Sequence, residues 1–128
     1  MKKKVLGAVV GVMVMASGVN AFAGTTAVVF NLSLPGFNGN ISTESQTKST
    51  SGATGNISSF NAGSTGNVDA RMIDDNGNNG SWTRKLSSGS YDLSSHSKHT
   101  NGTSVRAQFS SDLTTTVGVT ISGSFKSN

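Results

Sequence analysis

The stretch Thr115–Phe125, TTVGVTISGSF, alternates apolar and polar side chains along almost its whole length. Successive side chains of a β-strand point to opposite faces of a sheet, so this alternation predicts a strand with one buried face. The apolar phase holds Val117, Val119, Ile121 and Phe125, and the polar phase holds Thr116, Thr120, Ser122 and Ser124. A strand of this kind needs a second apolar layer to cover it.

The stretch Thr26–Gly36, TAVVFNLSLPG, has the same period, with its apolar phase formed by Val28, Phe30, Leu32 and Leu34. Shorter alternating runs follow in NVDARMI, SWTRKL and SVRAQF, and the second of these places Trp82, Arg84 and Leu86 on one phase. Turn residues separate the runs, and Asn76–Gly77 and Asn101–Gly102 are typical of tight hairpins. Beyond the N-terminal segment, no window shows a helical apolar stripe. We therefore expect an all-β fold, a small antiparallel β-sandwich of six to eight strands.

Residues 38–66 are poor in apolar side chains, and Ile41, Ile57 and Phe60 are their large apolar members. Two alternatives fit this composition: a pair of polar edge strands, or a long surface loop. We favour polar strands, because hydroxyl and charged side chains on an edge discourage aggregation.

The N-terminus has the features of a secretory signal peptide. Three lysines at positions 2–4 precede the apolar run Val5–Ala16, and small residues at Ala21 and Ala23 flank Phe22. This pattern predicts cleavage after Ala23, whereas the alternative of an uncleaved membrane anchor is disfavoured because glycines interrupt a short apolar run. We expect residues 1–23 to be a signal peptide and residues 24–128 to be one secreted domain.

The predicted mature chain is almost neutral. Three of the ten basic residues are in the leader, so seven remain against six acidic residues and the net charge is about +1. This balance gives no electrostatic argument for a nucleic-acid partner or an anionic membrane. The absence of cysteine excludes disulfides, thiol catalysis and cysteine-ligated metals. We expect no cofactor and no membrane span in the mature form, and a partner that is a protein or a component of the cell envelope.

Both histidines, His96 and His99, lie within Ser90–Phe109. We interpret this stretch as a hairpin that turns at Asn101–Gly102 and has the histidines near its exposed end. In a strand, residues three apart point to opposite faces, so the pair does not suit zinc chelation.

Catalytic patterns in this chain are unspecific. A triad of Asp92, one of the histidines and a serine is expected by chance in a chain so rich in serine, and a two-histidine ribonuclease mechanism is equally unspecific. We assign no catalytic residue.

The segment DDNGNNGSW, Asp74–Trp82, alternates oxygen-bearing side chains in the manner of a calcium loop. The EF-hand requires glycine at its sixth position and glutamate at its twelfth, where this chain has Asn79 and Lys85. A looser surface calcium site and a polar turn remain as alternatives, and we favour the turn. We assign no metal ligand.

Most aromatic residues, Trp82 among them, fall on the inward phase of a predicted strand and are expected in the core. Phe37 and Tyr91 are the candidates for exposed rings. We therefore expect ligand contacts in the loops around these rings, the acidic turn and the histidines. The candidate residues are Phe37, Asp74, Asp75, Asn76, Tyr91, His96 and His99.

The leader ending ASGVNAFAG, the cysteine-free polar chain, and the late runs TSVRAQF and TTTVGVTISGSF resemble small exported β-sandwich proteins of Gram-positive bacteria. A neighbouring group, the lactococcin-like bacteriocins, is similar in length, leader and β-sandwich character but is usually richer in Trp, Tyr and His. The resemblance implies no site residue.

We expect a non-enzymatic secreted protein that binds a partner or self-associates at the cell surface or in the medium. One alternative is a bacteriocin-like toxin that acts on the envelope of related bacteria. Another is a small secreted hydrolase.

Overall fold

The computed structural model describes residues 22–63, 67–112, 115 and 118–128. Most of the predicted signal peptide lies outside these ranges, and its last two residues, Phe22 and Ala23, form the short strand β2. Val117 of the Thr115–Phe125 stretch also lies outside the described residues. The described part of the chain consists of strands, turns and loops, with no helix, as the two-residue period predicts.

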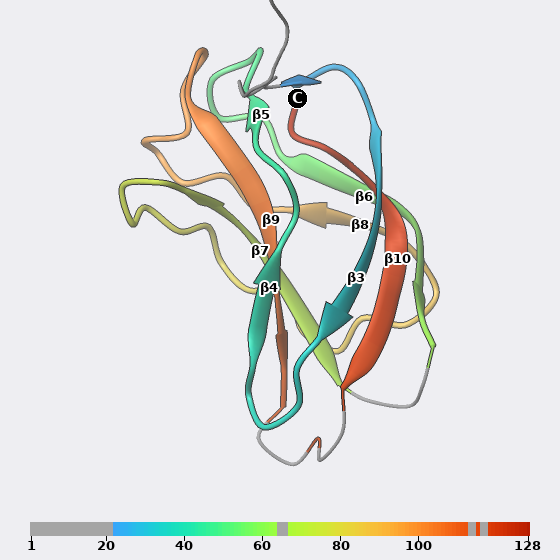
Figure 1. The fold of residues 1–128 in the computed structure, drawn as a ribbon. Coiled ribbons are helices and arrows are strands. Elements are labelled where there is room, and N and C mark those ends of the chain that lie inside the picture. The colour runs from blue at the N-terminus through green and yellow to red at the C-terminus, as the bar shows by residue number, and fades with distance from the viewer. Residues whose placement is uncertain (1–21, 64–66, 113–114, 116–117) are drawn as a thin grey trace, which may run out of the picture.

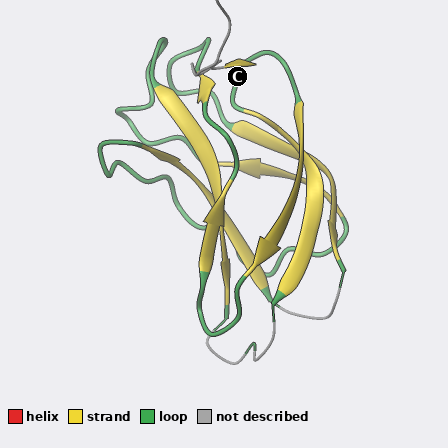
Figure 2. Ribbon diagram, in the orientation of Figure 1, coloured by secondary structure: helices red, strands yellow, loops and turns green. Residues whose placement is uncertain are grey.

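The strands form two sheets that pack face to face (Figure 1, Figure 2). The four-stranded sheet has the antiparallel order β3 (Val28–Leu34), β10 (Val119–Lys126), β6 (Gly55–Ala62) and β8 (Gly89–Leu93). The second sheet is centred on β9 (Ser104–Ser111), which pairs on one side with β7 (Val68–Asp74). On its other side β9 pairs with β4 (Asn40–Ser42) and β5 (Gln46–Thr47), and β5 pairs in parallel with β2 (Phe22–Ala23). The predicted antiparallel β-sandwich is confirmed.

The two strands with the clearest alternation, β3 and β10, pair with each other, with Leu34 opposite Val119 and Val28 opposite Phe125. Their apolar phases face the core, as predicted. Gly123 stands opposite Phe30 with a φ of 155°, and a Cβ at this position would lie 3.1 Å from Phe30 Cζ. Glycine at position 123 therefore leaves room for the Phe30 ring.

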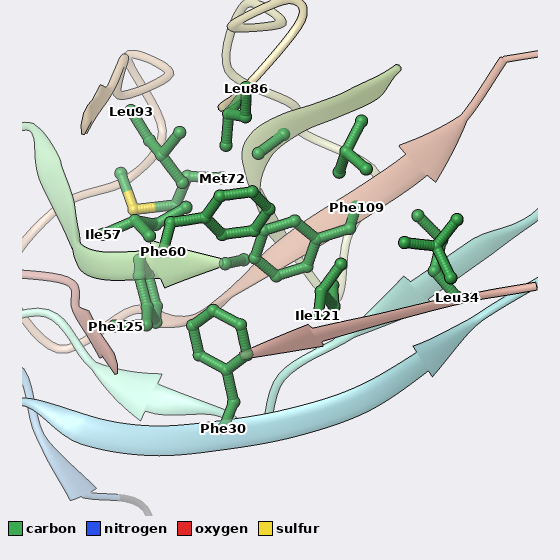
Figure 3. Close-up of a cluster of buried hydrophobic side chains, with 14 of the residues drawn as sticks. Phe30, Leu34, Ile57, Phe60, Met72, Leu86, Leu93, Phe109, Ile121 and Phe125 are labelled. Carbon is green, nitrogen blue, oxygen red and sulfur yellow. The ribbon is translucent and has the colours of Figure 1, made fainter. Parts of the chain in front are cut away.

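Aromatic rings join the two sheets at the centre of the core (Figure 3). The ring centroid of Phe109, on β9, lies 5.1 Å from that of Phe30 on β3 and 5.9 Å from that of Phe60 on β6. Phe60 and Phe109 are nearly parallel, with 15° between their planes. Such pairs stabilise a core beyond the burial of their area, by about 0.5–1.5 kcal/mol each.

The hairpin expected over Ser90–Phe109 is wrong. Strand β8 pairs with β6 in the four-stranded sheet, whereas β9 pairs with β7, β4 and β5 in the other sheet. Residues 94–103 cross between the sheets, and Asn101–Gly102 forms a turn within this connection, where the Thr103 N–H donates to the Thr100 carbonyl at 3.0 Å. Alternation identifies a strand with one apolar face, but it does not identify the neighbour of that strand.

The polar middle of the chain forms strands rather than a long loop in its described part, residues 38–63. Strands β4 and β5 lie at an edge, as expected for polar strands. Strand β6 instead lies between β10 and β8, where it buries Ile57 and Phe60. Two apolar side chains on one face are therefore enough to hold this strand inside a sheet.

Residues 79–86 run beside β7 but do not form a regular strand. Thr83 exchanges two backbone hydrogen bonds with Ala70, at 2.7 and 2.9 Å. Leu86 is buried in the core, whereas Trp82 is half-buried and outside it. The prediction that Trp82 shares a buried face with Leu86 is wrong, because Lys85 has a φ of 57° and interrupts the two-residue period.

Candidate functional site

Asp74, the last residue of β7, is a buried carboxylate that organises the turn after it. Its Oδ1 accepts hydrogen bonds from the N–H groups of Asn76 and Asn78, and its Oδ2 accepts one from Asn78 Nδ2, each at 2.9 Å. Burial alone raises the pKa of Asp74, but the Asn78 and Asn76 hydrogen bonds, with an electrostatic contribution from His99, hold it below its ordinary value. This carboxylate is therefore occupied by groups of its own loop.

The 94–103 connection packs against this turn. His99 is fully buried; its Nε2–H donates to the Asn78 carbonyl at 2.9 Å, and its Nδ1 accepts from the His96 N–H at 3.0 Å. His96 is half-buried, and its Nδ1 accepts from the Lys98 N–H at 3.0 Å. The expectation that both histidines lie at an exposed hairpin end is wrong, because the Asp74 turn covers His99. We call Asp74, Asn78, His96 and His99 the loop cluster.

The loop cluster offers little to a metal ion. The carboxylate of Asp74, both ring nitrogens of His99 and Nδ1 of His96 already form hydrogen bonds within the chain. Asp75 forms an ion pair with Arg106 of β9 at 2.7 Å. Across the described residues, no group of three or more His, Cys, Asp or Glu side chains lies close enough to hold a metal ion.

Tyr91 lies away from the loop cluster and braces the sandwich. Its ring is half-buried and meets Phe60 edge-on, with centroids 6.4 Å apart. Its hydroxyl donates to the Ser87 carbonyl at 2.9 Å and accepts from the Ser87 N–H at 2.8 Å. A tyrosine bonded to the backbone a few residues upstream fixes a corner in many β-sandwiches.

Phe37 is 64% exposed, as expected for a ring on a turn, but it lies at the other end of β9 from the histidines. Its N–H donates to the carbonyl of Thr115, which follows β9, whereas His99 precedes β9. An eight-residue strand is about 26 Å long. The predicted ligand-contact residues therefore do not form one surface.

Two buried polar side chains beside the C-terminal end of β10 were not predicted. Lys48 Nζ donates to the carbonyls of Ala53 and Ser127, at 2.6 and 2.8 Å, and burial lowers the pKa of this amine. Gln46 donates to the Phe125 carbonyl at 2.6 Å and accepts from the Ser127 N–H at 2.8 Å. These bonds tie β5 and the adjacent Lys48 to the end of β10 and so connect the two sheets. Figure 1 shows β5 close to the C-terminus.

The three arginines of the chain lie on one side of the β9 sheet: Arg71 and Arg106 on the outer face of β7 and β9, and Arg84 in the segment beside β7, bonded to Asp69. Arg71, on β7, donates from Nε to Gln108 Oε1 at 2.7 Å, and its guanidinium lies 4.3 Å from the centroid of the Trp82 ring. The Arg84 guanidinium lies 5.7 Å from the same centroid. We call Arg71, Trp82, Arg84 and Arg106 the arginine–tryptophan face.

Asp69 fixes the Trp82 segment on β7. Its buried carboxylate accepts from Arg84 Nη1 at 2.7 Å and from the Lys85 N–H at 2.9 Å. Within the described chain, each arginine of the face has one polar side-chain partner: Gln108, Asp69 or Asp75. Because a guanidinium has five N–H donors, most of the donor capacity of this face remains for a partner.

The sequence contains part of the signal for this face. Arg71 and Arg106 occupy the polar phase of their runs, NVDARMI and SVRAQF, which predicts outward side chains. The pairing of β7 with β9 is what makes these arginines neighbours, and the irregular 79–86 segment brings Trp82 to them.

Comparison with known protein families, curated proteins and solved structures found no match to this chain. None of the described residues belongs to a helix long and apolar enough to cross a membrane.

Proposed function

We propose that this chain is a non-enzymatic, secreted binding protein that contacts a partner at the cell surface or in the medium through the arginine–tryptophan face. The observation that carries the proposal is the position of the Arg71 and Arg84 guanidinium groups over the Trp82 ring. Arg106 lies two residues from Gln108, the β9 partner of Arg71. Tryptophan and arginine are the residues most enriched among those that dominate binding energy at protein interfaces. The planar guanidinium also suits carboxylate and phosphate groups, which it binds with two parallel hydrogen bonds.

The side chains of the arginine–tryptophan face are preorganised in the free protein, which favours affinity for a partner. Asp69 and Gln108 hold two of the arginines, and the ring of Trp82 lies against both Arg71 and Arg84. Ordered side chains lose less conformational freedom on association, so more of the contact energy contributes to affinity.

The loop cluster supports a structural role for the residues that a hydrolase would use. The carboxylate of Asp74 and both ring nitrogens of His99 hold loops together. The carboxylate of Asp92 accepts a hydrogen bond from Asn56 Nδ2 at 2.6 Å. These contacts support a binding role over the hydrolase alternative.

The test measures retention of the purified protein on isolated envelopes of related Gram-positive cells. Arg71→Gln and Trp82→Leu should each weaken retention by about tenfold, the loss of a hot-spot contact. Lys98→Gln is the matched control, because it removes one positive charge from the exposed 94–103 connection. If all three variants are retained as well as the wild type, the proposed contact surface is refuted. Cooperative thermal unfolding of each variant shows that it is folded.

Growth inhibition and hydrolysis are recorded with the same samples. Killing of the cells would favour the bacteriocin-like alternative. Turnover of RNA, peptide or glycan substrates would favour the hydrolase alternative.

A further inference from the structure

Strand β3 forms one edge of the four-stranded sheet, and among the described strands its partner is β10 alone (Figure 1). Seven consecutive residues, VVFNLSL, make up this strand, and none of them is charged. Val29 projects from its outer face with 80% of its surface exposed, the highest value among the large apolar side chains of the described chain. We call the side of β3 away from β10 the free edge.

The other described edges carry the features that keep edge strands from pairing with other molecules. Strand β8 is shorter and carries the exposed Asp92. On the far side of β9, the edge is formed by the three-residue strand β4 and by the two-residue strand β2, which pairs with β5. Three residues that include the exposed Glu44 separate β4 from β5. Residues 79–86 cover the outer side of β7. The free edge of β3 has neither charge nor cover within the described chain.

A groove of about 360 Å³ lies beside the free edge. One wall is β3 itself, from Val28 to Leu32, and the other includes Thr43, Glu44 and Gln46 from the edge of the β9 sheet. Val28 and Leu32, which point toward the core, are only half-buried here. A further strand on β3 would cover both side chains and complete the wall of the sandwich.

We propose that the free edge of β3 pairs antiparallel with the same edge of a second copy of this chain, which joins two four-stranded sheets into one continuous sheet. The proposal concerns the sheet opposite the arginine–tryptophan face and goes beyond the proposed binding role. It stands whether or not that face binds a partner.

A second copy fits this edge because the strand is complementary to itself. A two-fold axis through Asn31, the central residue, pairs all seven residues and places Val29 opposite Ser33 and Phe30 opposite Leu32 of the second copy. In every such pair both side chains lie on the same face. The apolar rows therefore join on the core side, and the rows of Val29, Asn31 and Ser33 join outside. No like charges meet, because the strand has no charge.

The first measurement is sedimentation of the purified protein over about a hundredfold range of concentration, with backbone hydrogen exchange at both ends of the range. Pairing through β3 predicts a monomer–dimer equilibrium and slower exchange within residues 28–34 at high concentration, because the N–H groups on the free edge gain partners. Exchange locates the contact without any substitution.

The second measurement compares Val29→Lys with Ser58→Lys. Val29, Ser124 and Ser58 form one row across β3, β10 and β6 on the outer face, so both substitutions add the same charge to exposed positions of the same sheet. Lysine at the edge should weaken dimerisation by about tenfold or more, whereas lysine on the inner strand β6 should leave it unchanged.

Three outcomes would overturn the proposal. The first is a protein that stays monomeric at every concentration. The second is a dimer whose slowed exchange lies outside residues 28–34, or that both lysine variants weaken equally. The third is a free edge that becomes protected only when an extended peptide of another protein is added.

Discussion

Asp74→Ala should strongly destabilise the fold, because it removes the acceptor of three hydrogen bonds at 2.9 Å. A hydrogen bond to a charged group contributes about 1.5–3 kcal/mol. Water partly offsets the loss of these bonds, because Asn76 is exposed and Asn78 is half-buried. We expect a total loss of about 3 kcal/mol in the free energy of unfolding. For a domain of this size that lowers the melting temperature by about 15 °C.

Two variants separate the charge of Asp74 from its hydrogen bonds. Asp74→Asn keeps one carbonyl oxygen for the N–H groups of Asn76 and Asn78 but presents an amide to Asn78 Nδ2, so we expect a loss of about 1 kcal/mol. Asp75→Asn is the matched control, because it removes the same charge from the adjacent residue. Its ion pair with Arg106 is solvent-exposed, so this loss should stay below about 0.5 kcal/mol.

The pH dependence follows from the direction of the pKa shift. The pKa of Asp74 is below its ordinary value of 3.8, so at acidic pH the unfolded chain binds a proton more readily than the folded one. The contribution of Asp74 is therefore complete above the ordinary value and is lost as the pH falls through the lowered pKa. Asp74→Asn should flatten the acid limb of the stability curve.

The assay is urea unfolding of the four proteins, at neutral pH and along an acid series. An Asp74→Ala protein within about 0.5 kcal/mol of the wild type would refute the reasoning, because that is the range of ordinary surface substitutions. An unchanged acid limb in Asp74→Asn would show that other carboxylates determine acid stability.

Three further predictions can be checked by urea or thermal unfolding. Lys48→Met should cost about 2 kcal/mol, because the buried Ser127 carbonyl and the partly buried Ala53 carbonyl lose their donor. Since burial lowers the pKa of Lys48, the free energy of unfolding of the wild type should increase as the pH rises from the lowered pKa to the ordinary 10.5, and the variant should lack this increase. Tyr91→Phe should cost about 1 kcal/mol, because it removes the hydroxyl bonded to Ser87, and an unchanged melting temperature would contradict this corner role. Gly80→Ala should cost about 3 kcal/mol, because its Cβ would overlap the Ser94 carbonyl oxygen, and a neutral result would contradict that close approach.

The candidate site was less predictable than the fold. The sequence predicts a polar turn after Asp74. It does not predict the hydrogen bond between Asn78 in this turn and His99, which lies 21 positions later. The contact between Arg71 and Gln108 joins residues 37 positions apart. Neither contact can be predicted from the alternation of side chains or from turn residues, since both patterns describe only residues close together in the sequence.

Local side-chain order by itself determined the all-β class, the inward rows of β3 and β10, and the positions of the turns, because each of these depends on residues a few positions apart. Tertiary structure decided which strands are neighbours. In the folded protein β8 and β9 belong to different sheets, and the Asp74 turn covers His99. Trp82 lies outside the hydrophobic core, beside Arg71 and Arg84. The physical reason is that any strand with one apolar face satisfies the same period, and the choice among partners depends on how all the faces pack together at once.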